Sequence, residues 1–211
     1  MFGRIISVGH LLLAGSVLLL PACIDPKVDP SAQPEPPGPV APNPAMEALR
    51  VPALPATATR ARYDFESKVE LVGYELDPVQ AKPGANIKVT WYWRASAPPQ
   101  GDWFLFTHLL DQGGRQFANY DRPGSLRAAG SISSWQKGAI YADQQEFQLP
   151  ADLNTPYVTI AVGVWSGLVR LDIIGGLADR KNRALVIRLP VSGLPKPPPP
   201  VSLEPPPAIA K

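Results

Sequence analysis

Hydrophobic and polar residues alternate with a period of two through most of residues 68–190. The clearest case is residues 87–94, which read Ile-Lys-Val-Thr-Trp-Tyr-Trp-Arg. Successive side chains of a strand point to opposite faces of its sheet, so one face of this strand belongs to a hydrophobic core. The core face carries Ile87, Val89, Trp91 and Trp93, and the other face carries Lys88, Thr90, Tyr92 and Arg94.

Turn residues recur about every eight to twelve positions in this region, a spacing typical of all-β sandwiches and barrels. Residues 103–110 are almost continuously apolar, as in a central strand, and the Asp-Gln-Gly-Gly at 111–114 predicts a hairpin turn. No stretch of about eleven residues has a clean helical period, so we expect little helix. The predicted strands are residues 69–76, 87–94, 103–110, 115–120, 146–149, 157–165, 170–174 and 184–189.

Two details favour an immunoglobulin type of sandwich over a closed barrel. Tyr157 opens an apolar strand just after a turn, which is the place of a tyrosine corner, whose hydroxyl bonds back across that turn. Trp91 or Trp93 would supply the buried indole on an early strand. We therefore predict an all-β fold, an immunoglobulin-like antiparallel β-sandwich of about seven to nine strands.

The two ends of the chain differ from this middle in their proline content. Of 27 prolines, eleven lie within residues 21–55 and nine within 190–207. Segments so rich in proline and so poor in aromatic residues bury too little apolar surface to offset chain entropy. We therefore predict a tether at residues 23–62, the domain at 63–192 and a disordered tail at 193–211. A proline-rich motif that binds a partner's groove is the alternative for the tail.

Residues 1–22 resemble the signal peptide of a bacterial lipoprotein. Arg4 precedes an apolar run at residues 5–20, which is shorter than the roughly 20 residues that a membrane span needs. Leu-Pro-Ala-Cys follows directly, and a cysteine at such a cleavage site resembles the lipobox. The resemblance implies cleavage before Cys23, a diacylglycerol on its sulfur and an acyl chain such as palmitate on its amino group. Cys23 would then anchor the protein in the cell envelope, and Ile24 favours the outer membrane over the inner membrane.

Composition and charge narrow the range of partners. Cys23 is the only cysteine, so the domain is expected to fold without a disulfide. The chain carries 20 Lys and Arg against 18 Asp and Glu, and no basic stripe interleaves with aromatic residues, which argues against a nucleic-acid partner. The basic cluster at residues 180–183 is typical of a solvated turn rather than of a phosphate site.

Several short motifs resemble a bacterial immunoglobulin-like module of envelope proteins. They are Leu-Val-Gly-Tyr at 71–74, Lys-Pro-Gly at 82–84, Val-Thr-Trp-Tyr-Trp at 89–93, Phe-Thr-His-Leu-Leu-Asp at 106–111, Ser-Trp-Gln-Lys-Gly at 134–138 and Leu-Pro at 149–150. That module is similar to the extracytoplasmic β-sandwiches appended to membrane-bound glycosyltransferases. The resemblance covers about residues 66–190 and departs at 154–156, where Asn-Thr-Pro stands in place of the usual Pro-Gly. It implies a binding or spacing accessory without catalysis.

Once the signal peptide is removed, His108 is the only histidine, so any histidine-dependent catalysis must use it. A hydrolase would pair it with a serine of residues 131–134 and with Asp111 or Asp121. No Gly-x-Ser-x-Gly motif is present and His108 lies inside an apolar strand, so a hydrolase is the third interpretation of function. One histidine and a lipidated cysteine are too few for a zinc site. We predict no cofactor, with a single calcium ion between acidic loops as the alternative.

Residues 122–138 form the longest predicted loop inside the domain, and such loops are usually functional or mobile. We place the candidate ligand site there, with His108, Asp121 and Trp135 as its parts. Exposed aromatic rings and a few polar side chains can hold a sugar, so a carbohydrate-binding lipoprotein is the second interpretation. The first is a non-catalytic, lipid-anchored accessory module that binds an envelope protein or a glycan. Other aromatic residues near strand ends, for which core packing is the alternative role, are Trp103, Trp165 and Tyr120.

Overall fold

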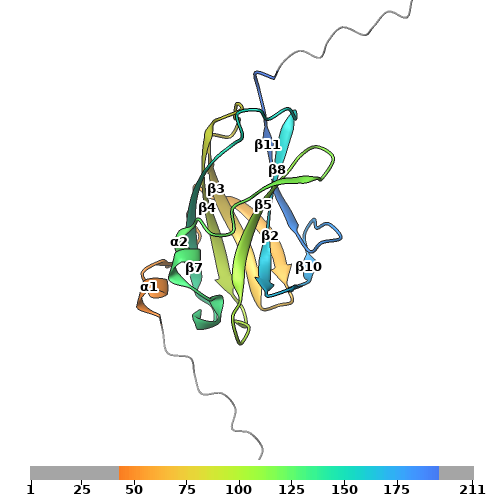
Figure 1. The fold of residues 1–211 in the computed structure, drawn as a ribbon. Coiled ribbons are helices and arrows are strands. Elements are labelled where there is room, and N and C mark those ends of the chain that lie inside the picture. The colour runs from red at the N-terminus through yellow and green to blue at the C-terminus, as the bar shows by residue number, and fades with distance from the viewer. Residues whose placement is uncertain (1–42, 195–211) are drawn as a thin grey trace, which may run out of the picture. The chain divides into compact units, whose positions relative to one another are not determined.

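The computed structural model describes residues 43–194 and confirms the all-β fold (Figure 1). Its strands are β1 (Arg50–Val51), β2 (Thr59–Phe65), β3 (Val69–Asp77), β4 (Asn86–Ala95), β5 (Phe104–Leu110), β6 (Gln116–Asn119), β7 (Ile140–Gln148), β8 (Tyr157–Ser166), β9 (Val169–Arg170), β10 (Ile173–Gly175) and β11 (Ala184–Pro190). Eight of these eleven strands are four residues or longer, which agrees with the predicted number. The only helices within residues 43–194 are α1 (Pro44–Glu47), α2 (Ser125–Ala129) and the 3-10 turn η1 (Ile132–Ser134).

The strands form two antiparallel sheets. The large sheet has the order β1-β7-β4-β3-β2-β10, and the small sheet has the order β11-β8-β5-β6, with β9 paired to β8. The chain crosses from one sheet to the other five times, between β4 and β5, β6 and β7, β7 and β8, β9 and β10, and β10 and β11. β4 pairs with β7, while β5, β8 and β11 lie side by side, which is the arrangement of strands B and E and of strands C, F and G in an immunoglobulin sandwich.

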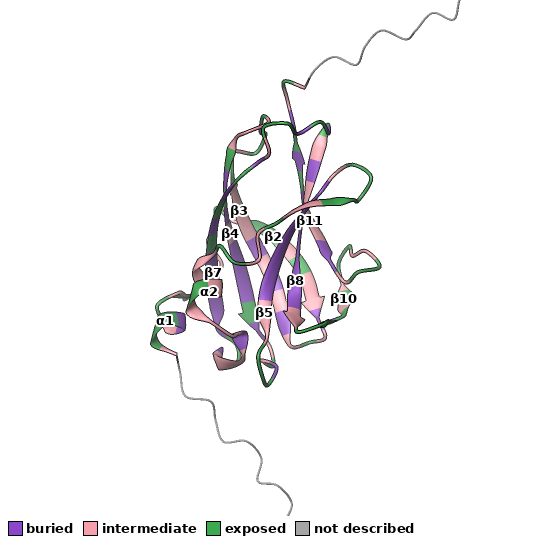
Figure 2. Cartoon of the chain, in the orientation of Figure 1, coloured by how far each residue is buried: buried purple, intermediate pink, exposed green. Residues whose placement is uncertain are grey.

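The inner faces of both sheets share one hydrophobic core (Figure 2). Trp91 and Trp93 of β4 are fully buried there, as the alternation of residues 87–94 predicts. The Trp93 ring lies 5.7 Å from that of Phe65, in a tilted arrangement favourable for aromatic pairs. Tyr157 opens β8 as expected, but its hydroxyl donates to the carbonyl of Gln112 in the β5–β6 turn, at 3.3 Å, instead of across the turn just before it.

The domain begins earlier than the proline content predicts. Residues 43–62, expected to belong to the tether, contain α1, β1 and the start of β2, and Met46 is fully buried in the core. Pro44 occupies the first turn of α1, where a missing N–H costs nothing, and Asn43 caps that helix by accepting from the N–H of Ala45. Prolines at helix starts and in loops are compatible with ordered structure. The prediction from proline content therefore placed the start of the domain too late in the chain.

A segment of this early region crosses the outer face of the large sheet. Leu54 packs so closely on Gly73 of β3 that an added Cβ at Gly73 would lie 2.7 Å from its side chain. Thr57 hydrogen-bonds Glu75, which also accepts from the Tyr92 hydroxyl at 2.9 Å. Tyr92 is therefore buried although its position in β4 predicts an outward-facing side chain. Burial, and the hydrogen bond to Glu75, raise the pKa of Tyr92 to about 12.

Strand β7 is longer than predicted. The prediction missed its first half because the inward face of this strand is partly polar. It begins at Ile140 instead of Glu146, and two of its inward residues, Asp143 and Gln145, are buried in the domain interior. Polar residues at core positions conceal the alternation that identifies a strand. The predicted strand at 170–174 is divided between β9 and β10, and the predicted loop at 122–138 contains α2 and η1.

Several predictions concern residues that the structure does not describe. The signal peptide at 1–22, the lipidation site Cys23, the tether up to residue 42 and the tail beyond residue 194 all lie outside the described residues. Among residues 43–194, no helix has the length and apolar character needed to cross a membrane.

Candidate functional site

The structure brings two of the three predicted site residues together. His108 of β5 pairs in register with Asn119 of β6, and Asp121 lies two residues beyond the end of that strand. The His108 Nε2 atom lies 3.5 Å from Asp121 Oδ1. His108 is only 3% exposed, whereas the Asp121 side chain keeps 21% of its surface exposed. The pair therefore lies at the small sheet's surface with its histidine covered.

Asp121 acts as a brace between β5 and the end of β6. Its Oδ1 accepts a hydrogen bond from the Thr107 N–H at 2.9 Å, and its Oδ2 accepts from Asn119 Nδ2 at 2.8 Å. Burial acts to raise the pKa of Asp121, but hydrogen bonds from His108, Asn119 and the Thr107 N–H outweigh it and lower the pKa. Asp121 is thus held as an anion whose two oxygens already have protein donors.

Trp135, the third predicted site residue, does not join this pair. It caps η1 and is only 4% exposed, and its ring stacks on that of Tyr141 at 4.9 Å. Within residues 43–194, no hydrogen bond or ring contact connects Trp135 to His108 or Asp121. The expectation of an exposed indole at this position is wrong, because the 122–138 segment folds its apolar side chains back into the core.

A buried polar network lies beneath the same segment. Arg127 of α2 forms an ion pair with Asp143 of β7, and both side chains are almost completely buried. Asp143 also accepts from the N–H of Leu126 at 2.9 Å, and Arg127 donates to Thr107 Oγ1 at 2.8 Å. Burial raises the pKa of Asp143, while the Arg127 guanidinium opposes this shift. The pair fastens α2 to both sheets.

Gln145 extends this network to the centre of the core. Its Oε1 accepts from Trp91 Nε1 and from Thr107 Oγ1, both at 2.8 Å, and its Nε2 donates to the carbonyl of Tyr120 at 3.0 Å. Sequence analysis did not identify this network. Its only signal was the run of polar residues at 143–146 between apolar neighbours, which has no strand or helix period.

A groove crosses the outer face of the small sheet next to Asp121. It consists of two adjoining cavities of about 870 and 350 Å³, which share Asn119, Asp121 and Trp165 in their walls. We call this feature the outer groove. Phe104, Arg122 and Arg127 line the larger cavity, and Phe106, His108, Gln116 and Arg170 line the smaller one. Both volumes fall in the range of small-molecule sites.

Aromatic rings form one wall of the outer groove. Trp165 of β8 lies 6.2 Å from Phe104, and Phe106 stacks on His108 at 4.6 Å. Phe106 and His108 alternate with the core residues Leu105 and Leu109, so they occupy the outward face of β5. The Phe106 ring sits directly over Gly163, where any added Cβ would collide with it.

Arginines stand at both ends of the outer groove. Arg122 is exposed, and the Arg170 guanidinium carbon lies 4.5 Å above the centre of the Phe106 ring, a cation–π distance. Burial, with the nearby Arg183 guanidinium, lowers the pKa of Arg170. Arg183 itself is buried, and its Nε donates to Asp179 Oδ2 at 2.7 Å within the 179–183 turn. The basic cluster at 180–183 is therefore a turn with one internal ion pair and exposed Arg180 and Lys181.

Three residues that line the outer groove carry buried nitrogen atoms without a hydrogen-bond partner. Among residues 43–194 there are five such atoms, and three of them are His108 Nδ1, Arg127 Nε and Trp165 Nε1. Buried polar groups normally have partners, so their concentration at one place distinguishes it from the rest of the domain. The remaining two atoms belong to the core residues Trp93 and Trp135.

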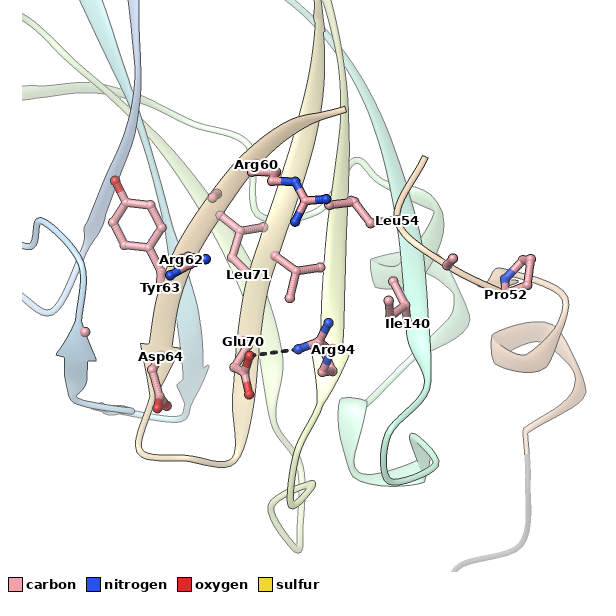
Figure 3. A pocket seen from close by; sticks show the side chains of 14 residues that line it. Pro52, Leu54, Arg60, Arg62, Tyr63, Asp64, Glu70, Leu71, Arg94 and Ile140 are labelled. Atoms are coloured by element: carbon pink, nitrogen blue, oxygen red, sulfur yellow. Dashed lines mark hydrogen bonds and ion pairs between the residues drawn. The ribbon is translucent and has the colours of Figure 1, made fainter. Parts of the chain in front are cut away.

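A second cavity, of about 690 Å³, lies on the outer face of the large sheet (Figure 3). Its charged side chains are three exposed arginines and two half-buried acids. The one ion pair among them, Arg94 with Glu70, is long at 3.4 Å. Its lining contributes none of the unpartnered buried nitrogens in the described part of the chain. We therefore take the outer groove, and not this cavity, as the candidate site.

The described residues contain no group of three or more His, Cys, Asp or Glu side chains that could hold a metal ion. The serines proposed for a hydrolase make their hydrogen bonds elsewhere: Ser131 accepts from the Trp103 N–H and donates to the carbonyl of Gly101, and Ser133 bonds Ser131. No protein-family model matches the chain, and no curated protein matches it.

Proposed function

We propose that this chain is a lipid-anchored, non-catalytic binding module of the bacterial cell envelope whose ligand is a saccharide held in the outer groove. One observation carries the proposal: the aromatic wall formed by Phe104 and Trp165 meets the polar side chains of Asn119, Asp121 and Arg122 in a single cavity. A sugar ring needs both kinds of contact, an apolar ring for its C–H face and a few fixed polar groups for its hydroxyls.

A binding role fits the polar residues of the groove better than a catalytic one. His108 is stacked on Phe106 and directed at Asp121, whose oxygens are occupied by Thr107 and Asn119. A general base must reach the proton of a nucleophile or of a water in an open site. The buried His108 instead holds the floor of the groove in place, which supports an accessory module over a hydrolase.

The anchoring part of the proposal rests on the sequence around Cys23. Two or three acyl chains hold a protein stably on a membrane, whereas one holds it only marginally. Cys23→Ser should abolish fatty-acid labelling and release the protein from the membrane fraction. Density-gradient fractionation then tests the outer membrane against the inner membrane. Equal labelling of the variant would end the lipoprotein interpretation without touching the groove.

The binding part is tested by titrating the mature chain, from residue 23 onward, with peptidoglycan fragments and polysaccharides in a calorimeter. Trp165→Ala should lower the affinity for the bound saccharide at least tenfold, because it removes the main aromatic surface of the groove. Trp103→Ala is the matched control, since Trp103 is half-buried like Trp165 but lies outside the groove. Equal affinities of both variants and the wild type would refute this site.

A further inference from the structure

Two arginines along the outer groove are free to bind a ligand, whereas the acidic side chains near it already have protein partners. Within residues 43–194, neither Arg122 nor Arg170 is in an ion pair with a carboxylate. Arg170 donates from one terminal nitrogen to the carbonyl of Lys181 at 2.7 Å, which leaves its other N–H groups free. Arg122 is exposed at the opposite end and makes no hydrogen bond to the described residues.

The acidic residues near the groove are, in contrast, already engaged. Asp143 is paired with Arg127, and Asp179 is paired with Arg183. Asp121 accepts from Thr107 and Asn119 and lies beside His108. Among the described residues, the lining of the groove therefore offers two guanidinium groups without a carboxylate partner, whereas its one carboxylate, Asp121, has a protein donor on each oxygen. A ligand therefore meets an excess of available positive charge.

We infer that the saccharide bound in the outer groove is anionic, a chain whose sugars carry carboxylate or phosphate groups that Arg122 and Arg170 bind. This inference rests on the proposed function of the groove as a saccharide site. The planar guanidinium group matches carboxylate and phosphate oxygens with two parallel hydrogen bonds, and such charge-assisted bonds are about twice as strong as neutral ones.

The positions of the two arginines also set the length of the ligand. Arg122 lines only the larger cavity and Arg170 only the smaller one, with the shared wall of Asn119, Asp121 and Trp165 between them. A single sugar in one cavity reaches one arginine. An oligosaccharide that passes over Trp165 reaches both, so affinity should rise with chain length until both cavities are filled.

The test compares pairs of ligands that differ in charge. The mature chain is titrated with oligogalacturonate and with its neutral methyl ester, and with phosphomannan and unphosphorylated mannan, at two salt concentrations. The anionic member of at least one pair should bind about tenfold or more tightly, with an advantage that shrinks at high salt. The pair that shows this advantage identifies the group as a carboxylate or a phosphate.

Variants then assign the effect to the groove. Arg122→Gln and Arg170→Gln should each lower the affinity for the anionic ligand about tenfold and lower the affinity for the neutral ligand much less, so that most of the anionic advantage is lost. Arg60→Gln is the matched control, since Arg60 is an exposed arginine of β2 on the other sheet. Three outcomes would contradict the inference or the proposal on which it rests.

If neutral and charged ligands bind equally, and only Trp165→Ala loses affinity, the inference is overturned but the groove remains a saccharide site. If anionic binding persists in Trp165→Ala, it is non-specific attraction and the inference is overturned. If none of these saccharides binds, the result counts against the proposed function itself.

Discussion

The two outward faces of the sandwich carry cavities of comparable size but differ in what lies beneath them. On the large sheet, Leu54 and Thr57 cross over β3, and the surrounding arginines remain in water. On the small sheet, His108 and Arg127 are almost completely buried in the groove's lining. Volume alone would not separate the two faces. The buried polar groups distinguish them, because burying a polar group is energetically unfavourable and an ordinary exposed surface contains no such groups.

This difference follows from where each face places its ion pairs. Arg94 and Glu70 meet at 3.4 Å on an exposed surface, where water screens the attraction. Arg127 and Asp143 meet in the interior, where an unpaired charge would be very costly. The first pair can be lost with little effect, whereas the second ties α2, β5 and β7 into one unit.

The largest expected effect concerns the early segment that covers the large sheet. A chain that starts at Asp64 lacks Met46, β1 and most of β2, so it should lose the cooperative thermal transition. A chain of residues 43–194 should keep that transition and a β-type circular dichroism spectrum. An equally sharp transition in the shorter chain would show that residues 43–63 are dispensable for folding.

Breaking the buried ion pair should have the next largest effect. Arg127→Ala leaves Asp143 buried without its cation, which should lower the free energy of unfolding by about 3 to 5 kcal/mol in denaturant titrations. Replacing both residues by Met and Leu should recover much of this loss, because no buried charge then remains. A loss below about 1 kcal/mol in Arg127→Ala would mean that water reaches the pair.

The brace at the groove should matter less than the pair beneath it. His108→Ala removes a buried ring that stacks on Phe106 and faces Asp121, so it should lower the free energy of unfolding by about 1 to 3 kcal/mol. The sequence predicted His108 and Asp121 as parts of a ligand site, and the structure adds a structural role for both. An unchanged melting temperature in both His108→Ala and Asp121→Asn would contradict this structural role.

The pH dependence of stability tests the charge of the brace. The folded-state pKa of Asp121 lies below its ordinary value of about 3.9, so its contribution is complete above that pH and is lost as the pH falls through the lower folded value. Asp121→Asn should therefore be less stable than the wild type at pH 7. The difference should shrink below about pH 4, whereas a constant difference would show that the charge is not involved.

The smallest effect is expected on the large sheet. Arg94→Ala removes an exposed ion pair with Glu70 and should change the free energy of unfolding by about 1 kcal/mol or less. Added salt should reduce even that difference. A loss as large as that of Arg127→Ala would abolish the contrast between the two faces.

The sequence predicted the structure correctly where buried and exposed residues alternate regularly along a strand. The alternation at residues 87–94 placed Trp91 and Trp93 in the core, and the Asp-Gln-Gly-Gly turn placed the β5–β6 hairpin. It was misleading at β7, where Asp143 and Gln145 face inward, and at residues 43–62, where prolines stand at positions that tolerate them. The sequence grouped His108, Asp121 and Trp135 as one candidate site. The structure brings His108 and Asp121 within 3.5 Å of each other, whereas the Trp135 ring stacks on Tyr141 in the core.

By itself, the sequence determined the all-β class, the central strands and the extent of most of the sandwich, because these depend on local patterns of apolar and polar residues. Only the tertiary structure decided which polar residues meet: Arg127 with Asp143, and Asn119 and Asp121 with Trp165 in one groove. Those residues are up to 46 positions apart in the chain and come from five different elements or loops. Their contact depends on how two sheets cross and pack, which no local period encodes.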